Sequence, residues 1–222
     1  GVTKEETPEV FDTFMEYTTK AYQSMEIPLE LSFIPIHPGD ILSYGGYHFE
    51  VKLLKGHTFG QCGLYEPEKK LMFVGDQLMT TIVPIVGTQE TDLGMLKCYL
   101  DSLGDLKHNY KDCYFLPCHY GEIRNVEKEV NRIILGYLEK CEIMKHVLEE
   151  AGTALTTRDI GVRTYGRSQG PPDYAHFASC TYIWAKTFSC MEYMMGEGFV
   201  ERSERDGIIY WKAPSIHFEN NR

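Results

Sequence analysis

The chain has 222 residues, a formal net charge of −10 and 43% hydrophobic residues. This length suits one large domain or two small ones, with enough apolar side chains for a buried core. The acidic balance argues against general binding to nucleic-acid phosphates, which depends on Lys and Arg. No run approaches the ~20 apolar residues of a membrane span. The seven cysteines are scattered without the spacing of a disulfide scaffold, so we expect a cytoplasmic protein.

The predicted elements of the first 150 residues are helices and short strands. Thr7-Pro8-Glu9 is typical of a helix start, and apolar residues then recur at spacings of three and four to about Met25. Short apolar or alternating runs with turn residues between them predict strands, and helical spacing returns in two later segments. The expected strands are 41–44, 47–54, 62–65, 71–74 and 113–116, and the expected later helices are 91–103 and 125–150.

The organisation changes after Gly152, which is placed to end the long helix. A short helix over 155–165, an aromatic-rich helix over 174–195 and two strands around an Asp206-Gly207 turn are expected to follow. Helix, helix and β-hairpin in this order are typical of a winged-helix module. We therefore expect a mixed α/β (α+β) part over 1–150 and a mostly helical, winged-helix-like module over 151–222.

Three islands of metal-binding residue types follow predicted strands. Each places one candidate ligand where a strand gives way to a loop, among glycines that allow close backbone approach. Neutral imidazoles suit zinc or iron, and a carboxylate can bridge two ions. A single His or Asp in such a place is more often an ordinary polar loop residue, so the prediction depends on all three islands. They are Lys55-Gly56-His57-Thr58-Phe59-Gly60, Phe73-Val74-Gly75-Asp76 and Leu116-Pro117-Cys118-His119-Tyr120-Gly121.

In this order the islands resemble the motifs of the metallo-β-lactamase-fold hydrolases, the superfamily that includes glyoxalase II. The residues Gly56-His57-Thr58-Phe59-Gly60 are similar to a Gly-His-Thr-Pro-Gly motif whose His binds metal. The later Gly-Asp and the last His are similar to the carboxylate that bridges two ions and to the final imidazole ligand. The resemblance covers roughly the first two-thirds of the chain. It implies metal ligands at His57, Asp76 and His119, with Asp76 as the shared catalytic carboxylate.

The chain also departs from the family pattern. Phe59 stands where the family has Pro, Gln61 where a second His is frequent, and Cys118 where a Gly precedes the last His. The family's His-x-His-x-Asp-His motif, which supplies four ligands, does not occur in these 222 residues. The resemblance is therefore to the second half of an αββα sandwich. Three ligands divided between two ions leave at most two for each ion, whereas catalytic zinc usually has three and a water molecule.

From this shortage we expect the chain to hold metal weakly or not at all by itself. It is expected to be an N-terminally incomplete piece of a longer hydrolase, or to be completed by another polypeptide. For the complete protein the resemblance implies two divalent ions, with zinc favoured over iron or manganese. Metal-activated hydroxide would attack an ester, thioester or similar bond of a small molecule. Tyr120 is a candidate for substrate binding, although a packing or surface role is more usual for such a tyrosine.

Two other functions stay open at this point. One is a non-catalytic binding or regulatory protein that acts through the winged-helix-like module, and the other is a nuclease. Residues 151–222 contain eight basic and eight acidic residues, and the basic stripe of a nucleic-acid-binding module is missing. We therefore expect this module to cover the active-site cleft or to form a contact in a homo-oligomer, and nucleic acid is not the expected partner.

Overall fold

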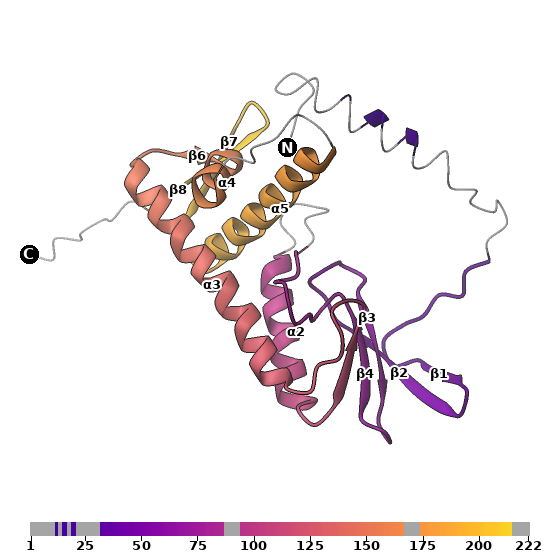
Figure 1. Cartoon of the computed structure of the whole chain (residues 1–222). Helices are drawn as coiled ribbons and strands as arrows, with labels where there is room; N and C mark the ends of the chain where they lie inside the picture. Colours follow the sequence, from indigo (N-terminus) through magenta and orange to yellow (C-terminus); the bar gives the residue numbers. More distant parts are fainter. Residues whose placement is uncertain are drawn as a thin grey trace, which may run out of the picture.

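The computed structural model describes residues 32–86, 94–166 and 174–214, with the side chains of 174–181 left out (Figure 1). The predicted helix over 7–25 lies largely outside the described residues. Within it, five residues are described, and all five have helical backbone: Asp12, Met15, Glu16, Thr19 and Lys20.

A five-stranded sheet with the order β1–β2–β3–β4–β5 forms the centre of the first part of the chain. Successive strands from β1 to β4 pair in antiparallel fashion, whereas β4 and β5 are parallel. The bounds lie within one residue of the strands predicted from the sequence. They are β1 (Ile41–Tyr44), β2 (Tyr47–Leu53), β3 (Cys62–Glu66), β4 (Leu71–Gly75) and β5 (Tyr114–Pro117).

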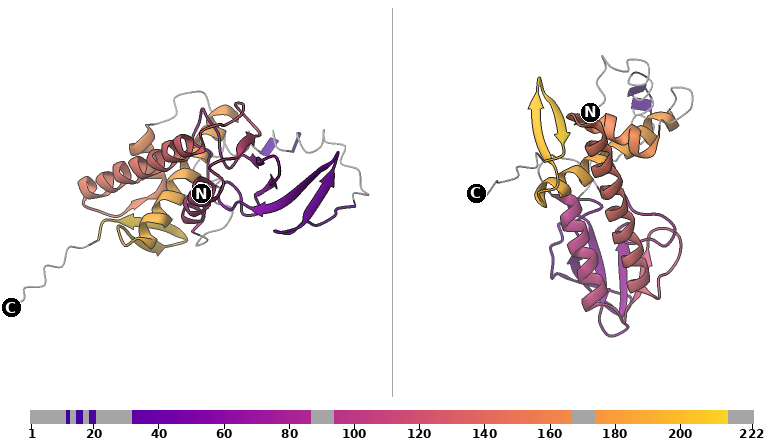
Figure 2. Two further views of the ribbon diagram at one scale, coloured as in Figure 1. Left: turned by 90° about the horizontal axis from the view of Figure 1, so that it is seen from below. Right: turned by 90° about the vertical axis from the view of Figure 1, so that its left-hand side faces the viewer.

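Two helices, α2 (Met95–Asn109) and α3 (Val126–Ala151), lie on one face of this sheet (Figure 2). The strands direct Met72, Val74 and Phe115 toward them, and these three side chains are fully buried in a cluster with the apolar faces of both helices. Because side chains alternate along a strand, the intervening residues lie on the opposite face of the sheet.

That opposite face, which we call the outer sheet face, is also apolar. The strand register aligns Val51, Leu64, Phe73 and Leu116 in a row across β2 to β5. The ring of Phe73 meets that of Phe49 edge-on, yet Phe73 remains 42% exposed. A sheet that is apolar on both faces normally packs against a layer on each side.

The helix after β4 differs from its predicted position. It begins at Met95, after Gly94 in the left-handed conformation, and continues beyond Leu103 to Asn109. Leu103 and Leu106 are both fully buried, so the apolar face extends past the predicted end and packing keeps the last turn helical. The long helix α3 begins and ends within one residue of its predicted bounds.

The remaining elements form a second, smaller group. Two helices and a three-stranded sheet of order β6–β8–β7 follow α3. The helix, helix and hairpin order agrees with the prediction, and the winged-helix assignment itself stays a prediction. Among the helices the structure describes, none combines the length and apolar character needed to cross a bilayer. The elements are β6 (Leu155–Thr156), α4 (Thr157–Tyr165), α5 (Tyr174–Gly196), β7 (Glu201–Arg205) and β8 (Ile208–Lys212).

The start of α4 was predicted two residues too early. Leu155 and Thr156 form a short strand that pairs with Trp211 and Tyr210 of β8. Thr156 then caps the helix in a reciprocal arrangement with Asp159, in which each side chain bonds the main chain of the other. The strand pairing and the cap together hold Thr156 in an extended conformation that a helix interior would not allow.

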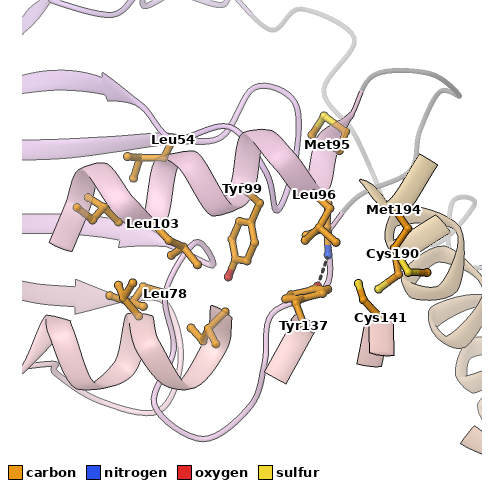
Figure 3. Close-up of a cluster of buried hydrophobic side chains, with 14 of the residues drawn as sticks. Leu54, Leu78, Met95, Leu96, Tyr99, Leu103, Tyr137, Cys141, Cys190 and Met194 are labelled. Atoms are coloured by element: carbon orange, nitrogen blue, oxygen red, sulfur yellow. Dashed lines mark hydrogen bonds between the residues drawn. The ribbon is translucent and has the colours of Figure 1, made fainter. Parts of the chain in front are cut away.

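The buried side chains of both parts join in one cluster (Figure 3). Cys141 of α3 lies beside Cys190 and Met194 of α5. Trp211 of β8 is fully buried, its ring meets Phe188 edge-on, and its indole N–H donates to a hydroxyl of α4. The core thus continues across residue 151, and the division of the chain there stays a prediction about its organisation.

Candidate metal centre

The three predicted ligands lie together at one edge of the five-stranded sheet. His57 follows β2, Asp76 comes directly after β4, and His119 follows β5. Because β4 and β5 are parallel neighbours, their carboxyl ends meet at the same edge and bring Asp76 close to His119. The sheet therefore assembles side chains that are far apart in the sequence.

Asp76 lies between the two imidazoles. Its Oδ2 atom is 3.6 Å from His57 Nε2, and its Oδ1 atom is 3.6 Å from His119 Nε2. Both distances are too long for a good hydrogen bond. They are close to the N···O separation of about 3.4 Å between two ligands of one tetrahedral zinc ion with bonds of ~2.1 Å. Each carboxylate oxygen thus faces a different imidazole, as a carboxylate shared by two ions would.

The environment of Asp76 also fits a cation. Its Oδ1 atom is buried and has no hydrogen-bond partner among the residues that the structure describes. Burial of an unpaired carboxylate oxygen is unfavourable unless a hydrogen bond or a metal ion compensates it. Within the same described ranges, no group of three or more His, Cys, Asp and Glu side chains is arranged to hold a single ion. The donors therefore fit two positions with two protein ligands each, and neither position is complete.

A main-chain carbonyl fixes the orientation of the His57 ring. His57 Nδ1 is 2.7 Å from the Ile85 oxygen. A carbonyl oxygen only accepts, so Nδ1 carries the hydrogen and Nε2 presents its lone pair toward Asp76. A ring nitrogen that donates to a carbonyl while the other faces a metal position is the usual arrangement of a histidine ligand.

Gln77 is a site residue that the sequence reasoning missed. Its buried side chain donates to the Lys55 carbonyl at 3.1 Å and to Ser102 Oγ at 3.0 Å, and it accepts from the His57 main-chain N–H at 3.4 Å. These bonds tie the loop before His57 to the residue after Asp76. The only local signal is a polar residue directly after Gly-Asp, which is too common in turns to be informative.

Gly56, directly before His57, leaves no room for a side chain because Tyr99 of α2 packs closely against it. Gly56 has φ +146°, and a Cβ atom there would lie 2.6 Å from Tyr99 Cα, a main-chain atom of α2. We expect Gly56→Ala to lower the free energy of unfolding by roughly 2 kcal/mol or more, through overpacking and backbone strain.

Gly60→Ala in the same loop is the matched control. A Cβ atom at Gly60 meets nothing within 4 Å, so its effect should stay within about 0.5 kcal/mol. Urea denaturation followed by circular dichroism measures both variants. Equal midpoints for the two variants would contradict the close approach of Gly56 to Tyr99.

His119 and Tyr120 form the open side of the centre. The His119 side chain is 61% exposed, and its ring centroid lies 6.0 Å from that of Tyr120. Tyr120 is itself exposed and has φ +69°, which is unfavourable for a residue with a Cβ atom. Its main-chain oxygen accepts a hydrogen bond from Thr80 at 3.1 Å, which helps to hold this conformation.

The three departures from the family motif lie around the centre and supply no ligand. Gln61 donates to the main-chain oxygens of Cys62 and Val74. Phe59 is half exposed with the Lys55 ammonium 4.9 Å from its ring centroid, and Cys118 is exposed. None of the three side chains removes a predicted ligand.

Comparisons with known proteins support the architecture. No family model matches the chain. A metallo-β-lactamase family protein from Thermus thermophilus is 20% identical with a TM-score of 0.68, over 95% of this chain and 67% of that one. A β-lactamase domain protein from Burkholderia ambifaria is 19% identical with a TM-score of 0.78, over 96% of this chain and 59% of that one.

Among curated proteins, the hydroxyacylglutathione hydrolase GloC of Haemophilus influenzae is 50% identical over 40 residues. The match covers 18% of this chain and 19% of that protein. The chain thus spans about two thirds or less of each of these three proteins. The two structural similarities extend over nearly all of this chain, and they show that it has the fold of the metallo-β-lactamase superfamily.

Proposed function

We propose that this chain carries part of the active site of a metal-dependent hydrolase that cleaves an ester, thioester or similar bond in a small molecule. The observation that supports this proposal is Asp76 between His57 and His119, with each imidazole 3.6 Å from a different carboxylate oxygen. Two divalent ions held there would lower the pKa of a water molecule and stabilise negative charge on a carbonyl oxygen. The nitrogen and oxygen donors suit zinc, with iron or manganese as alternatives.

The division of the ligands follows from the distances. His57 and Asp76 Oδ2 would hold one ion, and His119 and Asp76 Oδ1 would hold the other. The carbonyl of Ile85 keeps His57 in the tautomer that a ligand requires. Tyr120, exposed beside His119, would donate a hydrogen bond to the substrate from the open side of the centre.

Completion of the centre by further polypeptide is part of this proposal. Two protein ligands for each ion are fewer than the three of a catalytic zinc site. The outer sheet face is apolar and leaves Phe73 42% exposed. The two similar structures are longer than the region that this chain matches. A second layer, from the same or a separate polypeptide, would cover the outer sheet face and supply the missing ligands.

Equilibrium dialysis against Zn²⁺, with metal analysis of the dialysed protein, tests the proposed function. The chain alone should bind zinc weakly, at up to two ions per chain. A polypeptide that also contains the second layer should bind two ions tightly and hydrolyse small esters or thioesters. Failure of that longer polypeptide to bind zinc, iron or manganese would contradict the proposal.

The nucleic-acid alternatives are less well supported. Lys186 lies on α5, the helix that would be presented to nucleic acid by a winged-helix module. It is half-buried, with Nζ 5.1 Å from the ring centroid of Tyr137, and burial lowers its pKa. A helix that binds phosphates needs exposed cations instead. Tight, salt-sensitive binding of DNA or RNA in a filter assay would overturn this preference.

The strained backbone of Tyr120 leads to a separate prediction. Asn adopts the left-handed conformation more easily than Tyr. We therefore expect Tyr120→Asn to raise the free energy of unfolding by up to about 1 kcal/mol, measured by urea denaturation of this chain. In the hydrolytically active protein, the same change should raise KM several-fold. A lower stability together with an unchanged KM would contradict both the strain and the substrate contact.

A further inference from the structure

The segment 79–86, which we call the strap, links the candidate metal centre to helix α3. Arg132 of α3 donates from Nη2 to the main-chain oxygens of Met79 and Ile82, at 2.6 and 3.2 Å. On the other side of the strap, the Ile85 oxygen accepts the hydrogen of His57 Nδ1. The strap is therefore a physical connection between a predicted metal ligand and a helix that contains none.

Tyr137, which follows Arg132 along α3, holds the strap on both sides of Ile85. Its hydroxyl donates to the Pro84 oxygen at 2.6 Å and accepts from the Val86 N–H at 3.1 Å. Figure 3 shows Tyr137 inside the buried cluster, and the dashed line marks the hydrogen bond that its hydroxyl accepts from the main-chain N–H of Val86. The side chain is fully buried, and burial raises its pKa well above the ordinary value, so the hydroxyl keeps its proton.

The geometry points to Tyr137 as a positioning residue for the metal centre. We propose that it fixes the Ile85 carbonyl so that His57 adopts the Nδ1–H tautomer and directs Nε2 toward Asp76. A neutral imidazole has two tautomers, and the partner of one nitrogen decides which form is present. The inference rests on the proposed function because it takes His57 as a metal ligand. The tautomer of His57, however, can be measured in the absence of metal.

The last part of the chain contributes to the same arrangement. Ser189 of α5 is buried, and its hydroxyl lies 3.5 Å from the Val86 oxygen. The end of the strap thus lies between α3 and α5, where Pro84 and Val86 are buried and Ile85 is partly buried, whereas Ile82 is 44% exposed. The Ile85 carbonyl lies between two buried residues that Tyr137 anchors, which makes it a more rigid partner for His57 than a carbonyl in an exposed loop.

Tyr137→Phe tests the proposal because it removes one oxygen and keeps the ring. Long-range ¹H–¹⁵N NMR spectra of the metal-free chain, at a pH where imidazoles are neutral, report the tautomer of each histidine. His57 is assigned by the signals that disappear in His57→Gln. We expect a pure Nδ1–H form in the unmodified chain and a mixture of both tautomers in Tyr137→Phe. Zinc affinity should fall by roughly 10-fold or more.

Tyr165→Phe is the matched control. This tyrosine is close to Tyr137, and its hydroxyl is buried without a hydrogen-bond partner in the part of the chain that the structure describes. The same loss of one oxygen should therefore leave the His57 tautomer and the zinc affinity unchanged.

Two results would overturn the inference. One is a folded Tyr137→Phe chain, judged by circular dichroism, with His57 still in a pure Nδ1–H form. The other is an Nε2–H form in the unmodified chain. If Tyr137→Phe does not fold, Arg132→Gln frees the strap at a partly exposed position and should give the same mixture. An unchanged His57 tautomer in Arg132→Gln would also contradict the proposal. Absence of zinc binding by the longer polypeptide that contains the missing layer contradicts the proposed function, and the His57 tautomer of this chain decides the role of Tyr137 separately.

Discussion

Replacement of Asp76 by Asn is expected to lower the affinity for both metal ions by at least about 100-fold and to abolish hydrolysis by the completed enzyme. Each oxygen of Asp76 faces a different imidazole, so the carboxylate serves both positions. An amide is neutral and has one oxygen instead of two. The loss of groups that only orient a ligand already costs ~10–100-fold in metal affinity, so the loss of a shared ligand should cost more.

Two histidine variants sharpen this experiment. His57→Ala and His119→Ala should each remove one ion and leave the other, because each imidazole faces only one oxygen of Asp76. Asp101→Asn is the matched control, since this carboxylate is exposed on α2 and pairs with Lys97. Zinc stoichiometry by dialysis and metal analysis distinguishes the variants. If Asp76→Asn removes only one ion, or if either histidine variant removes both, the assignment of Asp76 as a carboxylate shared by two ions is wrong.

The largest expected effect on stability is that of Trp211→Ala, which should lower the free energy of unfolding by ~3–5 kcal/mol. Trp211 is fully buried, contacts the ring of Phe188, and donates from Nε1 to Thr157 Oγ1 at 2.9 Å. Alanine removes these contacts and leaves a cavity between β8, α4 and α5. The Thr157 hydroxyl would also lose its partner, which adds to the loss.

Ile208→Ala provides the comparison for Trp211, because Ile208 lies on the same strand and is 45% exposed. Its substitution should cost less than about 1 kcal/mol. Urea denaturation, followed by circular dichroism and tryptophan fluorescence, measures both variants. The continuous core predicts one cooperative transition by both probes in the unmodified chain. Two separate transitions would contradict it and would support independent domains on either side of residue 151.

Much of the fold was predictable because its elements have strong local signals. The strands from β1 to β5 are short apolar runs between turn residues, and the period of α3 is regular from Val126 to its glycine end. His57, Asp76 and His119 each follow a strand in a recognisable motif. The three motifs and their resemblance to a known family were therefore enough to propose that these side chains act together as metal ligands.

The supporting interactions were not predictable, because they join residues far apart in the sequence. Tyr137 is one of several apolar residues on the buried face of α3, and nothing near it indicates that its hydroxyl reaches Pro84. Leu155 looked like part of a helix because its strand partner, Trp211, comes much later in the chain. Gln77 gave no clear signal for the same reason, since its partners lie in an earlier loop and on a later helix.

The parallel pairing of β4 with β5 has a consequence for how the protein folds. The connection between these strands contains the whole of α2, so a long loop must close before Asp76 and His119 can meet. Contacts of this kind form slowly, and the ligands are assembled only when most of the chain is compact. Bound ions should therefore slow unfolding much more than they accelerate refolding.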